Sequence, residues 1–398
     1  MLKHTKKLFL IIVVLILPFG LLITAVSSKL QTSQISTLTA YESSSELTVD
    51  GIANEAVWGS ATSIIVTTLS GGSAPNTAIT FKAVFTTTYI YILASWADTT
   101  FSASRGRYEW NGTDFVNIAG SHSEDRLAIM WEITDIVGFD TLGCAVKCHS
   151  PSAYLGTGEV GDIWHLKAAR GMGALVATNS SPLTINPATF EAEAGIINII
   201  GVADDNVIDD VDRSGDSGSS PYRDNNNGTG APAFIETAPV NWMDAMYLTE
   251  AEISGGEAVN RSLITSQQDQ WYIANYTALG SIIPRHITSI GAGSRGDIHT
   301  GATWADGTWT VEIRRELNTN NSDDVAFDTN GGLYHFGVSL MDNSGGDADH
   351  SPAPVSILAF PTGGNSPGIS GFNVSFILII MFGAIGFYLF FKKRKYQK

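Results

Sequence analysis

Cysteine is scarce in this chain: only two occur among 398 residues, Cys144 and Cys148. An iron–sulfur cluster takes four ligands, mostly cysteines, and a structural zinc site takes four cysteine or histidine ligands. The sequence therefore offers no iron–sulfur site. A zinc site built on Cys144, Cys148 and the adjacent His149 would need a fourth ligand from elsewhere in the chain.

Basic residues are few between the two ends of the chain. Residues 30–371 hold 14 Lys and Arg against 39 Asp and Glu, a net charge of −25. Nucleic acids and anionic lipid surfaces both bind positively charged protein surfaces. The central region is therefore not expected to bind either of them.

Common catalytic motifs are also missing. The sequence has no nucleophile elbow, no HExxH and no phosphate-binding loop, and no carboxylate pair stands out by its spacing. Whether the chain is an enzyme stays open, with a non-catalytic role favoured.

No sustained 3.6-residue periodicity occurs between the ends. Short β-branched and aromatic runs separated by Gly, Asn, Asp and Ser predict strands, and residues 79–85 and 89–97 predict a hairpin. Other predicted strands cover 126–133, 197–203, 308–317, 334–342 and 353–360. The predicted fold is an all-β sandwich with long loops. The acidic segment 204–230 is expected to be a solvated loop rather than a calcium site, because it lacks the closing Glu of an EF-hand.

Both ends carry features of membrane targeting. Three lysines precede a long apolar run in residues 1–28, as in a signal peptide or an N-terminal anchor. Residues 372–391 are uncharged and long enough to span a bilayer, and a basic tail at 392–398 is expected to be cytoplasmic. The predicted order is completed by linkers at 29–40 and 361–371 around an extracytoplasmic domain at 41–360.

The segment GCAVKCHS, residues 143–150, allows three interpretations. A disulfide between Cys144 and Cys148 suits an oxidising compartment, although so short a loop stabilises little. A zinc site is the second. The third is covalent haem attachment, for which the usual pattern is C-x-x-C-H, whereas this chain has one extra residue, Lys147. Local spacing leaves disulfide and haem open.

Several segments, in order, resemble the haem-binding domains of the ethylbenzene dehydrogenase gamma-subunit type, which also occur in dimethyl-sulfide dehydrogenase-like enzymes and related c-type cytochromes. These segments are ELTVDGIANEAVWGSA (46–61), YILASWADTT (91–100), EDRLAIMWEI (124–133), GDIWHLKAAR (161–170), GDIHTGATWADGTWTVEIRRELNT (296–319) and YHFGVSLMDNSGGDADHS (334–351). The resemblance spans about 41–360. It implies a β-sandwich similar to DOMON domains and carbohydrate-binding modules, with one haem near the end of the sheets.

The dehydrogenases that these segments resemble hold a b-type haem with Met and Lys as the iron ligands. At the corresponding places this chain has GCAVKCHS and a loop ending in His350. The resemblance therefore implies a c-type haem, attached through Cys144 and Cys148, with His149 and His350 on the iron. His165 and Met130 are second-ranked ligands, with an ordinary strand histidine and a core methionine as the alternatives. Trp164 is expected on the porphyrin face or in the core, and Lys167 and Arg170 near the propionates or in surface salt bridges.

The expected function follows from this ligand set. Two imidazoles leave no open iron position, which favours electron transfer over substrate activation. The chain is predicted to be a single-pass cell-membrane cytochrome that exchanges electrons with a partner oxidoreductase, such as a molybdenum enzyme. The alternative is a haem-free carbohydrate-binding type of module with a Cys144–Cys148 disulfide.

Overall fold

The computed structural model describes residues 35–111, 114–118, 123–146, 154–186, 189–237, 239, 245–260, 282–346 and 349–362. Most regular structure in these ranges is β-strand, as predicted. The helices within them are short: α2 (Val57–Ser60), α3 (Phe139–Leu142), α5 (Glu250–Gly255), and the 3-10 turns η1 (Gly143–Val146) and η4 (Ser294–Gly296). No helix in these ranges has the length and apolarity needed to cross a bilayer. The predicted segments 1–28 and 372–391 lie outside the described residues.

The main strands form two sheets that share one long strand, β13 (Ile196–Ile208). Sheet A contains the C-terminal part of β13 together with β1 (Ser36–Thr39), β8 (Arg126–Glu132), β9 (Gly161–Lys167), β14 (Arg213–Gly215), β25 (Leu333–Met341), β26 (Ser351–Pro352) and β27 (Ser356–Ala359). Sheet B contains its N-terminal part with β2 (Tyr41–Glu42), β3 (Ser63–Thr67), β4 (Ala78–Phe85), β5 (Tyr89–Ala97), β10 (Met172–Asn179), β23 (His299–Ala305) and β24 (Thr308–Glu316).

The two sheets are joined along both sides. On one side, β13 pairs with β23 through residues 196–202 and with β9 through 204–208. On the other side, β1 pairs with β27 of sheet A and β2, which follows directly, pairs with β4 of sheet B. The result is a nearly closed sandwich, in which few backbone groups at sheet edges are left exposed.

Aromatic side chains fill the space between the sheets. Phe81 of β4 meets Phe336 of β25 with 6.0 Å between ring centroids, and Trp131 of β8 packs on Phe336 at 5.2 Å. Trp309 of β24 stacks on Trp96 of β5. Alternating residues of each strand thus face one common core, as expected for two sheets packed face to face.

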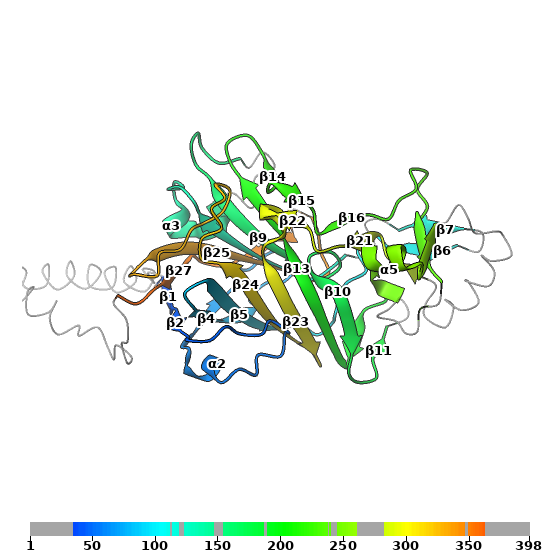
Figure 1. The fold of residues 1–398 in the computed structure, drawn as a ribbon, viewed down its shortest axis with the longest axis horizontal. Helices are drawn as coiled ribbons and strands as arrows, with labels where there is room; N and C mark the ends of the chain where they lie inside the picture. Colours follow the sequence, from blue (N-terminus) through cyan, green and yellow to red (C-terminus); the bar gives the residue numbers. More distant parts are fainter. Residues whose placement is uncertain are drawn as a thin grey trace, which may run out of the picture.

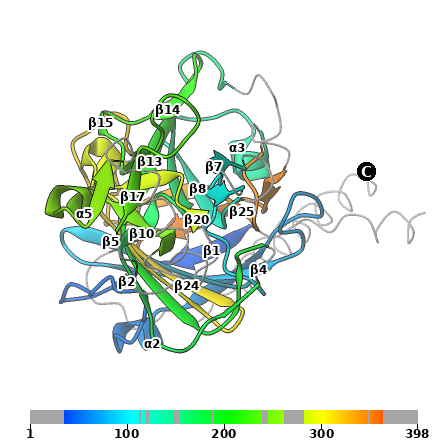
Figure 2. The same ribbon diagram turned by 90° about the vertical axis from the view of Figure 1, so that its right-hand side faces the viewer.

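Smaller sheets accompany the sandwich, several of them at one end. They consist of β6 (Tyr108–Trp110), β7 (Phe115–Asn117) and β20 (Ile282–Ile283); β16 (Tyr222–Asp224), β18 (Leu248–Thr249) and β21 (His286–Thr288); β17 (Phe234–Glu236) and β19 (Ala258–Asn260); β11 (Thr184–Ile185) and β12 (Ala192–Ala194); and β15 (Gly218–Ser219) and β22 (Ala292–Gly293). In Figure 1, β6, β7 and α5 lie at the right, far from β1 and β27 at the left. Figure 2 looks from that end, with β4 and β24 of sheet B below β8 and β25 of sheet A.

The acidic segment 204–230 is only partly the solvated loop that its composition predicts, because its first residues are buried whereas most of the later ones are exposed or half-exposed. Residues 204–208 complete β13, and β14, β15 and β16 follow within the segment. The side chains of Asp204 and Asp205 are buried. For these two residues the prediction was wrong: Asp204 forms ion pairs with Lys167 and Arg295, and Asp205 lies in the ladder between β13 and β9.

Candidate functional site

The outer face of sheet A is covered, although an outer face would ordinarily meet solvent. All seven residues of β9 are buried. Trp164 and Leu166 join the core between the sheets, whereas Ile163, on the other face, joins a separate cluster with Met130, Phe139 and other residues of the covering segment. Helix α3 and turn η1 thus form an apolar cover over β8 and β9.

A small cavity lies under this cover. Its volume is about 30 Å³, and two imidazoles, a thiol and two thioethers stand in its wall beside apolar groups. We call it the sulfur–imidazole cavity. It is lined by Ala128, Met130, Cys144, Ile163, His165, Arg213, Ser339, Met341 and His350. Four of the residues singled out from the sequence therefore meet there: Met130, Cys144, His165 and His350.

Cys144 reaches this place because two glycines, Gly143 and Gly337, allow a close approach of backbones: a Cβ added at Gly143 would lie 3.3 Å from the Cα of Gly337. A Cβ added at Gly337 of β25 would lie 2.3 Å from the Cys144 nitrogen. The Cys144 thiol is buried and donates to the carbonyl of Val338 at 3.4 Å. Turn η1 is thereby held directly on β25. Cys148 and His149 lie outside the described residues.

His350 is positioned by a loop from the other end of the sequence. The backbone nitrogen of Ser73 donates to the carbonyl of Asp349 at 2.9 Å, and that of Ala74 donates to the Ser351 hydroxyl at 2.9 Å. A Cβ at Gly72 would stand 2.4 Å from the His350 carbonyl, so only glycine fits. The buried Nδ1 of His350 has no hydrogen-bond partner among the described residues.

His165 is in a different state from His350. Its Nδ1 lies 2.7 Å from Nη2 of Arg213, and arginine can only donate. Burial, followed by the charges of Lys167 and Arg213, lowers the pKa of His165 well below its ordinary value, so the ring is neutral. A neutral ring that accepts at Nδ1 carries its proton on Nε2, and this buried N–H has no acceptor among the described residues. In this structure His165 therefore has a free hydrogen-bond donor, Nε2–H, that faces the described part of the cavity without an acceptor.

A group of arginines surrounds one carboxylate beside this cavity. Glu124 is fully buried and lies 2.8 Å from Arg170, 3.2 Å from Arg126 and 3.9 Å from Arg105. Burial raises the pKa of Glu124, but Arg170 and Arg126 outweigh it and lower the pKa to about 2. We call these four residues the arginine cluster. Its net charge is positive, and Nη2 of Arg126 makes no hydrogen bond with the described residues.

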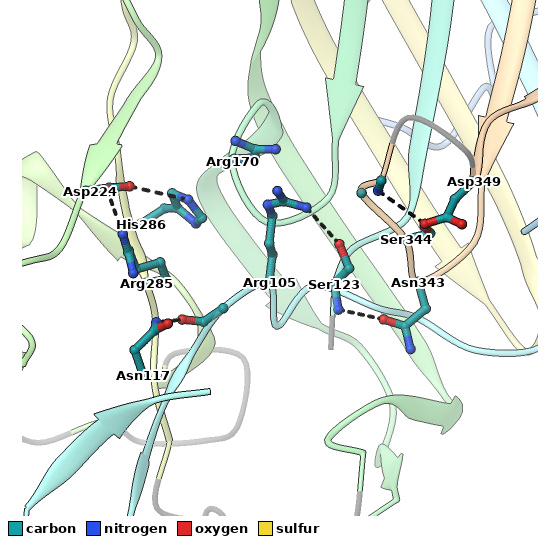
Figure 3. Close-up of a pocket in the computed structure, with 13 residues that line it drawn as sticks. Arg105, Asn117, Ser123, Arg170, Asp224, Arg285, His286, Asn343, Ser344 and Asp349 are labelled. Atoms are coloured by element: carbon teal, nitrogen blue, oxygen red, sulfur yellow. Dashed lines mark hydrogen bonds and ion pairs between the residues drawn. The ribbon is translucent and has the colours of Figure 1, made fainter. Parts of the chain in front are cut away.

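The arginine cluster opens into a larger cavity of about 540 Å³, shown in Figure 3. Arg105 lies at its centre and donates to the Ser123 hydroxyl at 3.0 Å. On one side Arg285 pairs with Asp224 at 2.8 Å, and on the other side lies Asp349, the residue before His350. The two cavities thus have consecutive residues in their walls. We call the larger one the arginine pocket.

His286 also lines the arginine pocket, 3.7 Å from Asp224. Burial and then the charge of Arg170 lower its pKa to about 3. The ring is therefore neutral at pH 7, and its contact with Asp224 is not an ion pair. The positive charge of the pocket comes from its arginines.

Trp164 and Lys167, two residues expected near a porphyrin, do not line the sulfur–imidazole cavity. Trp164 points into the core, with its ring 5.2 Å from that of Trp131 and its Nε1 donating to Asp162 at 3.1 Å. Lys167 shares the outer face with His165 but pairs with the buried Asp204. Arg170, in contrast, belongs to the arginine cluster.

Sequence reasoning missed several residues of this region, namely Arg105, Glu124, Arg126, Arg213 and Met341. A signal for two of them was present, because Glu124, Asp125 and Arg126 are consecutive charges directly before an apolar strand. Charges at the start of a buried strand need partners in the fold. The partners themselves come from distant segments that spacing does not connect.

Comparisons with known proteins give the family. Residues 55–353 match the family described as ethylbenzene dehydrogenase. The chain belongs to this family. The match includes Cys144, His165 and His350 and every strand of the two sheets except β1, β2 and β27.

No curated protein matches the chain. Among solved structures, a family 9 carbohydrate-binding module from Caldicellulosiruptor kristjanssonii in complex with cellotriose is 9% identical, covering 84% of this chain and 99% of that one with a TM-score of 0.31. A carbohydrate-binding protein from Bacteroides uniformis is 5% identical over 84% and 94%, with a TM-score of 0.30. At these scores neither structure says anything about the ligand of this family member.

Proposed function

We propose that this member of the ethylbenzene dehydrogenase family is an electron-transfer haem protein whose haem lies on the covered outer face of sheet A. What supports the proposal is one juxtaposition: the buried Cys144 and His350 share a cavity beside a cluster of arginines, in a chain of this family. A haem has an iron that takes nitrogen and sulfur ligands and two propionates that pair with cations. Both kinds of partner occur here side by side.

Cys144 would provide one thioether, and Cys148 the other. His350 would bind iron, because no described residue already engages its Nδ1, and His149 would be the second ligand. Met130, which lines the same cavity, would be the sulfur alternative. When bound, haem would supply one-electron chemistry.

The other residues of the region would bind and orient the propionate edge of the haem. Arg105, Arg126 and Arg170 carry more positive charge than Glu124 neutralises. The Nε2–H of His165 would donate to an acceptor in the cavity. Since the sulfur–imidazole cavity is no larger than a water site, the cofactor would also need room from the neighbouring arginine pocket.

The proposed partner is a redox protein outside the cytoplasm, with a molybdenum oxidoreductase complex as the candidate class. The predicted tethers at 1–28 and 372–391 would hold the domain on the outer side of the membrane.

Pyridine haemochrome spectroscopy of the full-length chain, produced in a host that attaches c-type haem, tests this function. We expect haem that survives acid–acetone extraction, loss of that covalent haem in Cys144→Ser/Cys148→Ser, and carbon monoxide binding by His350→Ala. His299→Ala is the matched control, because His299 is exposed on sheet B, and its spectrum should be that of the wild type.

Absence of haem from the wild-type chain would overturn the proposal. A Cys144–Cys148 disulfide in such a chain would favour the haem-free module, and stoichiometric zinc or copper without haem would favour a mononuclear metal site. An unchanged low-spin spectrum in His350→Ala would remove His350 from the iron.

A further inference from the structure

A cluster of buried and half-buried carboxylates lies on the opposite face of β9 from the sulfur–imidazole cavity. Six aspartates from five segments take part: Asp162 of β9, Asp205 of β13, Asp216 after β14, Asp297 after η4, and Asp323 and Asp324 between β24 and β25. We call it the carboxylate cluster. Arg315 of β24 is the guanidinium inside it.

Arg315 neutralises one part of the carboxylate cluster. It lies 2.7 Å from Asp162 and 3.6 Å from Asp324, and it is almost fully buried. Oxygens of Asp162, Asp205 and Asp324 lie within 4.8 Å of one another around this side. This part therefore already holds a cation that belongs to the chain.

The other part, formed by Asp216, Asp323 and Asp324, has no arginine within ion-pair distance of Asp216 among the described residues. One oxygen from each of the three lies within 4.8 Å of the others. The Ser294 hydroxyl donates to Asp323 at 3.1 Å and to Asp324 at 3.2 Å, and the backbone nitrogen of Ser217 donates to Asp323 at 3.1 Å. Asp323 and Asp324 are thus held in place by donors.

The side chain of Asp216 indicates a bound cation independently of the clustering of the three acids. Its side chain is only 4% exposed, it is aimed at Asp323 and Asp324, and neither of its oxygens has a hydrogen-bond partner among the described residues. A buried carboxylate without a donor or a cation is costly. Burial, followed by the charges of Asp162 and Asp323, raises the pKa of Asp216 to about 9.

We propose that Asp216, Asp323 and Asp324 bind a calcium ion. Calcium prefers carboxylate oxygens at about 2.3–2.6 Å, so oxygens up to about 5 Å apart can share one ion. The three residues provide only oxygen atoms as metal ligands, which disfavours the softer metals that prefer nitrogen and sulfur ligands. The ion would connect the end of β14 with the segment after β24, next to η4.

Isothermal titration calorimetry on the full-length chain, stripped of metal with EDTA and titrated with calcium chloride at pH 7, tests the site. We expect saturable binding by the wild type and at least about a tenfold loss of affinity in Asp216→Asn. Asp210→Asn is the matched control: it removes the same charge from the same segment, but Asp210 is exposed. Its affinity should equal that of the wild type.

Thermal denaturation is a second test, because the order of the melting temperatures of the wild type and Asp216→Asn should differ between EDTA and calcium. In EDTA, Asp216→Asn should melt at the same temperature as the wild type or higher, because it removes an unpaired buried carboxylate. In calcium the wild type should melt at the higher temperature, because only it gains from the ion.

Three results would overturn the site: no calcium uptake by the wild-type chain, equal uptake by Asp216→Asn, or a melting temperature of Asp216→Asn below that of the wild type in EDTA. None of them touches the haem proposal, since no residue is shared. Haem content and calcium uptake are measured separately.

Discussion

The arginine cluster and the carboxylate cluster are opposite versions of one arrangement. In the first, a single buried carboxylate, Glu124, is surrounded by three guanidinium groups. In the second, a single buried guanidinium, Arg315, is surrounded by carboxylates. Strand β9 runs between them, with His165 and Lys167 on one face and Asp162 on the other.

The surroundings of a buried acid, and not its residue type, decide its protonation state in these two clusters. Glu124 accepts hydrogen bonds from Arg170 and from the backbone of Ala169 at 2.9 Å, and its pKa falls to about 2. Asp216 is buried next to Asp162, Asp323 and Asp324, and its pKa rises to about 9. Each cluster has one central counterion and an excess of charge, so the first should attract an anionic group and the second a cation.

The largest effect is expected from removing the central arginine. In calcium-free solution, Arg315→Met should lower the free energy of unfolding by about 3–5 kcal/mol, because it leaves buried carboxylates without their cation. Urea denaturation measures this loss, and added calcium should recover part of it.

Arg314→Met is the control for that variant. Arg314 is next in sequence, but its guanidinium lies 4.8 Å from the ring of Tyr89 rather than among acids. Its loss should be about 1 kcal/mol or less. Equal losses in the two variants would break the comparison, because Arg315 would then contribute only packing.

An intermediate effect is expected from pH, with opposite signs in the two clusters. The pKa of Glu124 is lowered from 4.5 to about 2, so its contribution is complete above pH 4.5 and is lost as pH falls toward 2. This contribution is on the order of 3 kcal/mol. Asp216 has a raised pKa, so the calcium-free chain should instead lose stability as pH rises from about 4 to about 9.

Urea denaturation from pH 2 to pH 9 in EDTA separates the two contributions. Glu124→Gln should be destabilised at neutral pH and lack most of the acid-side decline, whereas exposed Glu46→Gln should follow the wild type. Asp216→Asn should lack most of the alkaline decline. A wild-type profile in both cluster variants would contradict the assignment of opposite states.

The smallest effect is expected at the edge of the arginine cluster. The Arg105 side chain is 32% exposed and lies 3.9 Å from Glu124, so Arg105→Gln should change the free energy of unfolding by less than about 1 kcal/mol. Arg170→Gln, at 2.8 Å and 13% exposed, should cost more. Urea denaturation measures both variants. If Arg105→Gln lowers the free energy of unfolding as much as Arg170→Gln does, solvent screens the Arg105–Glu124 pair less than the exposure of Arg105 indicates.

Much of the strand pattern could be predicted from the sequence. The hairpin expected over 79–85 and 89–97 is formed by β4 and β5, and the predicted strands at 126–133, 308–317 and 334–342 correspond to β8, β24 and β25. These runs are long, rich in aromatic and β-branched residues and bounded by turn residues, so local preference and burial agree. In the same way, order and spacing of short segments were enough to indicate the family.

The sites were harder to predict, because they depend on register and on close backbone contacts. Asp204 and Asp205 continue an apolar strand, and only the pairing of β13 with β9 shows that they are inside. Cys144 and His350 are far apart in the sequence and meet because Gly337 and Gly72 let the chain come close to itself. The residues that flank Gly337 and Gly72 in the sequence do not distinguish them from glycines in ordinary turns, so these close contacts could not be predicted.

The pairing of β1 with β27 also sets how the domain responds to mechanical force. The two strands are parallel, with Ser36 beside Ser356 and Thr39 beside Ala359. The chain therefore enters β1 at one end of this ladder and leaves β27 at the other. Tension between the two ends pulls the strands past each other, so the hydrogen bonds of the ladder carry the load together instead of opening one after another.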